Sequence, residues 1–431
     1  MMTHRLPNSP SLLIVSKVLG SILTLATAPL IARALGPDGR GITAGITAVV
    51  FLVPLLCGFG LPWVVRRRVA TAADPHAVIR SAQRLSVLSL IPALLISALA
   101  VSTIFSDLSS LEKIVFYLCL STTPLVVSRN VLISYFVVTK SYTKIAVLTL
   151  AQPLFYVGGI FVCFAIGQLA VVGVIAVYGL SIVATYVATI RFNVVRWRGS
   201  RVPFGALLRE SARAGGAQIA EMSSYRLGLI LLLPLAGASA LGQYSVATNI
   251  AMAPSPVGNA LGASSFVHIA KSSDREQSDI AAESIRHSTI VGLLAGALVA
   301  AIAPLAVPII FGNEFRPAIE TTLLLSVGTV LVIVNQVLTS SLFAINKGMA
   351  VTFSQLSGLV VSVPLLIIFG QKYGANGAAL SAVCGYFVTT LFGVSAMPVT
   401  IRGLVPRRGD FQSTFRALFR RAPDPVSGKT A

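Results

Sequence analysis

Twelve apolar runs of about 20 residues each determine what this chain can fold into. A run of this length crosses the ~30 Å hydrocarbon core of a bilayer as an α-helix. Charged residues make up only 11% of the chain, whereas soluble domains carry about 25%. The sequence therefore predicts an all-α polytopic membrane protein with about twelve transmembrane helices. The predicted spans are 11–35, 42–65, 83–105, 112–138, 143–166, 170–191, 216–236, 242–268, 287–311, 319–345, 348–370 and 375–400.

The runs fall into two groups of six that echo one another. Phe105 to Lys140 leads from one loop through a span to a basic turn, and Phe311 to Lys347 does the same at nearly equal length. A parallel repeat of this kind predicts two pseudo-symmetric six-helix bundles around a central cavity in which substrate binds. The expected parts are an N-terminal bundle (1–190), a basic linker with an amphipathic helix (191–215), a C-terminal bundle (216–401) and a basic tail (402–431).

Positive charge gathers in alternate loops. The chain has 33 Lys and Arg against 14 Asp and Glu, a net charge of +19. Of the basic residues, 25 fall on one side of the predicted membrane and five on the other. Basic loops stay in the cytoplasm, so we expect a multi-pass protein of the cytoplasmic membrane with both termini cytoplasmic. This asymmetry explains the net charge without a nucleic-acid partner.

Two basic segments outside the spans have an amphipathic pattern. In the linker, Phe204, Leu207 and Leu208 fall on one helical face, and apolar residues repeat at helical spacing between Phe411 and Phe419 in the tail. Arginines flank both patterns, which is typical of helices that lie on an anionic membrane surface. Membrane lipids are therefore expected partners. The alternative for the tail is docking of a protein partner.

The sequence contains no recognisable catalytic motif. The sequence has no GxxxxGK[ST] phosphate loop, its four cysteines form no CxxC pair, and its four histidines lack the spacing of metal ligands. Paired carboxylates suited to acid–base chemistry are absent from the predicted spans. The sequence thus predicts neither catalysis, nor a cofactor, nor a metal site.

Charged residues inside the spans are the candidate substrate-binding residues. Arg129 lies in the fourth span, Lys17 in the first, and Glu221 and Arg226 in the seventh. A charge at this depth is costly, so it is normally paired or faces an aqueous cavity. Glu221 precedes Arg226 by five residues, a poor spacing for a pair on one helix. For Lys17 and Arg129, snorkelling to the interface is the structural alternative.

Cations outnumber acids in the predicted cavity, and this excess favours an anionic cargo. Arginine binds phosphate or diphosphate groups through two hydrogen bonds at once. Arg33 and Arg40 flank the outer mouth of the predicted cavity. We expect them to act as gate or mouth residues, with a solvated loop charge as the simpler alternative.

Several motifs carry a resemblance to a known family: Pro29–Gly41, Tyr225-Arg226-Leu227, Ala240–Tyr244, Phe311–Phe315 and Tyr373–Ala379. With the six-plus-six layout, the chain resembles the polysaccharide-biosynthesis flippases of the multidrug/oligosaccharidyl-lipid/polysaccharide exporter superfamily. The resemblance implies export of a lipid-linked oligosaccharide on a polyprenyl diphosphate by alternating access. It also implies a polysaccharide polymerase or glycosyltransferases as candidate partners.

Three other functions are compatible with the sequence. A multidrug or cation antiporter of the same fold would need acidic residues in the membrane, where Glu221 is nearly alone. A peptidoglycan-precursor flippase would carry a different lipid-linked cargo. A non-transporting scaffold of a polysaccharide assembly complex would act through its basic tail.

Overall fold

The computed structural model describes residues 8–9, 11–192, 199–214 and 216–398, so the predicted tail helix lies outside the described residues. Within these ranges the chain is helical, with short connections and no strand. The helices are α1 (Ser11–Gly58), α2 (Leu61–Thr71), α3 (Pro75–Leu88), α4 (Leu90–Thr103), α5 (Ser110–Ser121), α6 (Thr123–Val138), α7 (Tyr142–Ala165), α8 (Val171–Ile190), α9 (Phe204–Ala214), α10 (Gly216–Ala251), α11 (Ser255–Lys271), α12 (Asp274–Ala306), η1 (Val307–Phe311), η2 (Asn313–Phe315), α13 (Ala318–Ala344) and α14 (Gly348–Ser395).

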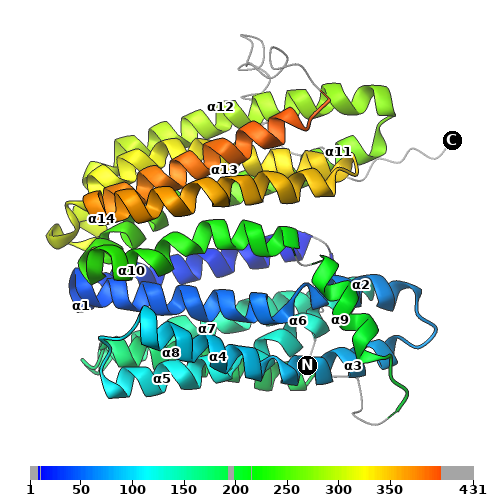
Figure 1. Ribbon diagram of the computed structural model, residues 1–431, viewed down its shortest axis with the longest axis horizontal. Coiled ribbons are helices and arrows are strands. Elements are labelled where there is room, and N and C mark those ends of the chain that lie inside the picture. The colour runs from blue at the N-terminus through cyan, green and yellow to red at the C-terminus, as the bar shows by residue number, and fades with distance from the viewer. Residues whose placement is uncertain (1–7, 10, 193–198, 215, 399–431) are drawn as a thin grey trace, which may run out of the picture.

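Nine helical segments of the described chain are long and apolar enough to cross a membrane. Three of them, α1, α10 and α14, contain a positive-φ glycine at which the helix turns back (Figure 1): Gly36 (65°), Gly237 (82°) and Gly374 (55°). Glycine adopts this left-handed conformation without a Cβ clash. Each of these three helices therefore continues from one predicted span into the next, and the prediction of an all-α fold with about twelve membrane helices is confirmed.

Helices α1 and α10 form the main contact between the two halves of the molecule. In Figure 1, α1–α8 lie in one half and α10–α14 in the other. A Cβ on Gly41 would lie 1.9 Å from the carbonyl oxygen of Ala238, and a Cβ on Gly242 would lie 2.0 Å from that of Pro37. Each of these glycines stands five residues after the positive-φ glycine of its own helix. The two halves thus touch backbone to backbone at equivalent positions.

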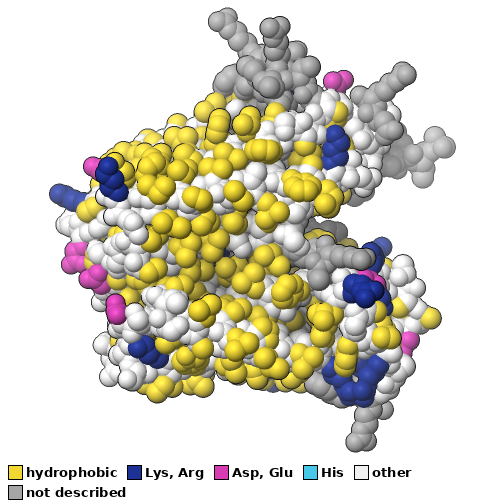
Figure 2. All heavy atoms as spheres, viewed as in Figure 1, with side chains coloured by type: hydrophobic (Ala, Val, Ile, Leu, Met, Phe, Trp, Pro, Cys, Tyr) yellow, Lys and Arg dark blue, Asp and Glu magenta, His cyan; other side chains and the backbone are white. Residues whose placement is uncertain are grey.

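The two ends of the molecule differ. We call the end that carries the turns of α1, α10 and α14 the closed end, because the halves meet there. Arg33 adds to this contact: its Nε donates to the carbonyl oxygen of Ile310 at 3.0 Å, and its Nη2 donates to that of Ile309. At the opposite end, near α2 and α9, Figure 2 shows a hollow between the halves. We call this the open end.

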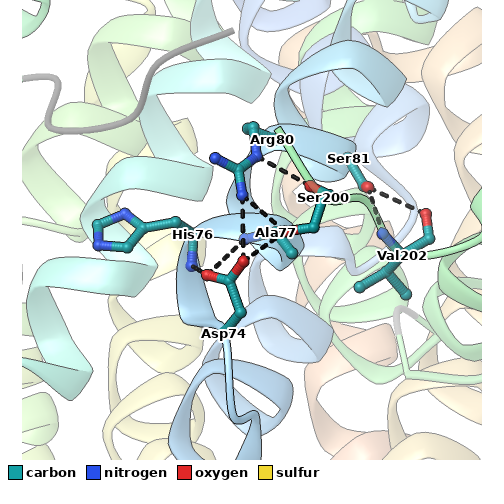
Figure 3. A network of polar contacts seen from close by, with 7 residues as sticks. All are labelled: Asp74, His76, Ala77, Arg80, Ser81, Ser200 and Val202. Carbon is teal, nitrogen blue, oxygen red and sulfur yellow. Dashed lines mark hydrogen bonds and ion pairs between the residues drawn. The ribbon is translucent and has the colours of Figure 1, made fainter. Parts of the chain in front are cut away.

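The linker is fixed to the first half by a polar network at the open end (Figure 3). Asp74 accepts hydrogen bonds from Ser200 Oγ at 2.6 Å and from Arg80 Nη2 at 3.1 Å. Arg80 Nε also donates to the carbonyl oxygen of Ser200 at 2.9 Å. The hydroxyl of Ser81 exchanges hydrogen bonds with the backbone of Val202, both at 2.9 Å. The described residues Ser200 and Val202 of the linker are therefore attached to α3 and to its N-terminal cap.

Helix α9 forms within the predicted amphipathic stretch, but its apolar residues do not share one environment. Leu207 is fully buried, whereas Phe204 and Leu208 are exposed. The reason is that α9 packs on α2 and α3, which cover one side of it. Only the outer side, with Phe204 and Leu208, is left available to a membrane surface.

Glu210→Gln is expected to loosen α9. The carboxylate of Glu210 accepts from Arg67 at 2.7 Å and from Arg68 at 2.5 Å, and the hydrogen bond from Arg68 lowers the pKa of Glu210 to about 2. A depressed carboxyl pKa stabilises the fold above the ordinary value of 4.5, and this stabilisation is lost as the pH falls towards 2. We therefore expect constant amide-exchange protection of 204–214 between about pH 5 and 8 in the wild type.

At pH 7 the Gln variant should exchange roughly two- to fivefold faster across 204–214, the range of an exposed ion pair. Asp279→Asn, at an exposed carboxylate on α12, is the control and should leave this exchange unchanged. Equal exchange in the wild type and Glu210→Gln would show that the ion pairs do not fix α9.

Candidate functional site

Arg129 is held inside the first half by a neighbouring helix. Its Nη1, on α6, donates to Oε1 of Gln152 on α7 at 2.6 Å. Its Nε is buried and has no hydrogen-bond partner. A buried donor without a partner costs about 1–3 kcal/mol. Arg129 therefore keeps hydrogen-bonding capacity that the described protein groups leave unused.

Arg226 lies at the contact between the halves. It occupies the middle of the α10 segment between Gly216 and the turn at Gly237. Its guanidinium carbon stands 4.6 Å from the ring centroid of Phe51 on α1, a cation–π contact across the two halves. The planar ring face leaves the N–H groups at the edge of the guanidinium free to bind another group.

Tyr178 on α8 joins these two arginines. Its hydroxyl hydrogen-bonds with Gln152, and it lies within electrostatic reach of both Arg129 and Arg226. One tyrosine thus lies within electrostatic range of a guanidinium group from each half. Glu210 and Asp74 form their ion pairs elsewhere, with arginines of α2 and α3. We call Arg129, Gln152, Tyr178 and Arg226 the arginine cluster; it presents positive charge with no described carboxylate beside it.

The other two predicted substrate-binding residues lie apart from the arginine cluster. Glu221 is half-buried on α10, and its described electrostatic neighbour is Tyr225, one turn further along. Lys17 is exposed on α1, and no described contact joins it to the cluster. The structure therefore brings together Arg129 and Arg226 but not Lys17 or Glu221.

The two predicted mouth residues have different surroundings. Arg33 is exposed at the closed end, where it bridges the halves through backbone carbonyl groups. Arg40 is half-buried within the first half, beside Tyr156, and its buried Nε has no hydrogen-bond partner. Tyr156 in turn packs edge-on against Tyr178, with ring centroids 5.5 Å apart. Arg40 is thus connected to the arginine cluster through two tyrosines.

Sequence reasoning missed the aromatic members of this arrangement. Gln152 is recognisable as a polar residue within an apolar span, but Phe51, Tyr156 and Tyr178 look like ordinary membrane aromatics. Nothing in their sequence surroundings tells which helix they face. Within the described ranges, no group of three or more His, Cys, Asp or Glu side chains gathers in a way that would hold a metal ion.

Comparisons with known proteins agree with this architecture. A family model described as polysaccharide biosynthesis protein matches residues 9–267. No curated protein sequence matches the chain. Among solved structures, the lipid II flippase MurJ in an inward closed conformation is similar, with a TM-score of 0.76, 11% identity, and 95% of this chain and 92% of that chain covered.

Multidrug-resistance transporters of the MATE family are also similar. An inward-facing structure gives a TM-score of 0.65 with 15% identity and covers 95% of this chain and 99% of its own. An outward-facing structure gives a TM-score of 0.60 with 17% identity, and the match covers 94% of this chain and 96% of that one. At these identities the likeness concerns the fold.

Proposed function

The chain belongs to the polysaccharide biosynthesis family of membrane flippases and exporters, and from this premise we propose that it carries a lipid-linked oligosaccharide across the cytoplasmic membrane. The cargo would be a glycan on a polyprenyl diphosphate, destined for a surface polysaccharide. Membrane lipids surround the protein, and a polymerase or glycosyltransferases would act on the same cargo. Transport would follow from alternate opening of the two ends.

The observation that carries this proposal is that two arginines inside the membrane region, Arg129 from one half and Arg226 from the other, lie within electrostatic range of the same residue, Tyr178. A diphosphate offers several acceptor oxygens, and arginine binds such groups bidentately. Because the two arginines come from different halves, a bound diphosphate would interact with both halves at once. Binding would then favour one arrangement of the halves over the other, as a carrier cycle requires.

The direction of transport in the proposal rests on the loop charges. The open end carries Arg66, Arg67 and Arg68 of α2 and the basic linker, so the positive-inside rule assigns it to the cytoplasm. A lipid-linked precursor assembled at the cytoplasmic face would then load through the hollow of Figure 2. The closed end would open to release it.

The test is translocation in vesicles. We expect the purified chain, reconstituted in liposomes, to move a fluorescent polyprenyl-diphosphate oligosaccharide between leaflets, measured by bleaching with an impermeant reductant. Empty liposomes provide the background rate. The same oligosaccharide on a diacylglycerol anchor without diphosphate should stay in its leaflet. Movement of both lipids at one rate would contradict recognition of the diphosphate.

The same assay separates the alternatives. Movement of a peptidoglycan-precursor lipid but not of the oligosaccharide lipid would identify the other flippase function. Extrusion of cationic dyes that depends on Glu221 would favour an antiporter. Absence of movement, together with loss of polysaccharide in cells when 411–431 is removed, would favour a scaffold.

A further inference from the structure

A pocket separate from the arginine cluster lies at the open end. It has a volume of about 220 Å³ and lies between the end of α1, α2 and α6. Arg66, Asn130 and Ser134 supply polar groups to its lining, and Trp63, half exposed, lies at its edge. Asn130 and Ser134 are four residues apart and share one face of α6. Arg129 lies on another face of the same helix and is directed at Gln152.

Arg66 differs from the two arginines that follow it. On a helix, consecutive residues point about 100° apart, so Arg66, Arg67 and Arg68 face different neighbours. Arg67 and Arg68 both pair with the carboxylate of Glu210. Arg66 instead stacks on Trp63, with 4.8 Å between its guanidinium carbon and the ring centroid, and its Nε is buried without a hydrogen-bond partner. The pocket therefore contains a fixed guanidinium whose buried donor lacks an acceptor.

The lining of the pocket suits an anion with several acceptor oxygens. The side chain of Asn130 takes part in none of the hydrogen bonds described for this part of the chain, so its amide is free to donate. Gly60, at the pocket wall, precedes the first turn of α2 without a side-chain cap, and helix N-termini attract negative charge. The volume lies below the roughly 300–1,000 Å³ of pockets for drug-sized ligands. It would fit a phosphate or diphosphate group but not a glycan.

We propose that this pocket binds the diphosphate of the lipid-linked cargo at the cytoplasmic end, before the cargo reaches the arginine cluster, with Arg66 as the anion-binding residue. The assignment of the anion to a lipid rests on the proposed function. The recognition of a phosphate group rests on the pocket itself. Trp63 would report occupancy, because its ring stacks on the guanidinium that binds the anion.

The experiment uses Trp63 emission in the full-length protein. Trp63 and Trp197 are the two tryptophans of the chain, so Trp197→Phe leaves Trp63 as the sole emitter. Farnesyl diphosphate, a short polyprenyl diphosphate, is titrated in detergent beside inorganic pyrophosphate and farnesol. We expect a saturable change in Trp63 emission with farnesyl diphosphate and weaker binding of pyrophosphate. Farnesol, which lacks the diphosphate, should give no saturable change. Arg66→Gln should weaken the binding of farnesyl diphosphate about tenfold or more.

Matched variants make the result decisive. Arg67→Gln removes a neighbouring charge outside the pocket and should bind like the wild type, whereas Arg66→Lys should bind with intermediate affinity because it lacks the planar fork. Ser134→Leu fills the pocket without changing charge and should also abolish binding. Each variant is first shown to be monodisperse by size-exclusion chromatography.

Three outcomes would overturn the inference. They are equal loss in Arg66→Gln and Arg67→Gln, a farnesol response equal to that of farnesyl diphosphate, and no response in the wild type. Arg66-dependent binding of pyrophosphate that is as tight as that of farnesyl diphosphate would overturn the assignment to a lipid. The vesicle assay is independent of this titration. Translocation without Trp63 binding would refute this pocket alone, and Trp63 binding without translocation would refute the proposed function.

Discussion

Replacement of Arg226 by glutamine is expected to slow translocation of the oligosaccharide lipid by roughly 10- to 150-fold, because a hydrogen bond to a charged group contributes about 1.5–3 kcal/mol. Glutamine keeps a polar side chain next to Phe51 but removes the positive charge and the planar donor fork. Arg129→Gln should have a comparable effect through the other half of the arginine cluster. Arg226→Lys should fall between the wild type and the glutamine variant.

The measurement is the vesicle assay with the fluorescent polyprenyl-diphosphate oligosaccharide. Arg191→Gln, at an exposed arginine just after α8, is the control and should translocate at the wild-type rate. If Arg129 and Arg226 bind one diphosphate, the double variant should lose less than the product of the two single losses, because neither arginine acts alone. Wild-type translocation by both single variants would refute the arginine cluster as the diphosphate site.

Local sequence patterns were sufficient to predict most of the fold. Hydropathy is a property of consecutive residues, so it located the spans, and the repeat of turn residues indicated two similar halves. The sequence did not reveal that α1, α10 and α14 each continue from one predicted span into the next through a positive-φ glycine. Whether Gly36 ends a helix or merely redirects it depends on what packs beside it, which here is the other half.

Only part of the candidate site could be predicted from the sequence. Arg129 and Arg226 stand out because a charge within an apolar span is rare. Their partners do not, because the face that a helix presents to its neighbour is set by tertiary packing. Arg40 shows what the sequence could not predict. Its position near a turn predicted a residue at the mouth of the cavity, whereas in the structure its side chain lies within the first half, beside Tyr156.

Gly242→Ala is expected to open the closed end. The added Cβ would lie 2.0 Å from the carbonyl oxygen of Pro37, and because this partner is backbone, α1 and α10 must separate to accept it. Overpacking of this kind costs about 1–3 kcal/mol. The contact exists only while the closed end is shut, so this cost falls on one state of the carrier. The population of the opened state should rise roughly 5- to 150-fold, and translocation should slow because the closed end no longer shuts.

The test is labelling of a cysteine at Ala247, a buried residue on α10 beyond the contact with Pro37, in a chain whose four native cysteines are replaced. An impermeant maleimide should label it slowly in the wild type and much faster in Gly242→Ala. Gly41→Ala should behave in the same way, because its Cβ would lie 1.9 Å from the carbonyl oxygen of Ala238. Gly158→Ala is the matched control: its Cβ would meet nothing within 4 Å, so labelling should stay slow. Slow labelling in both Gly41→Ala and Gly242→Ala would mean that the α1–α10 contact does not separate, and that the halves do not alternate about it.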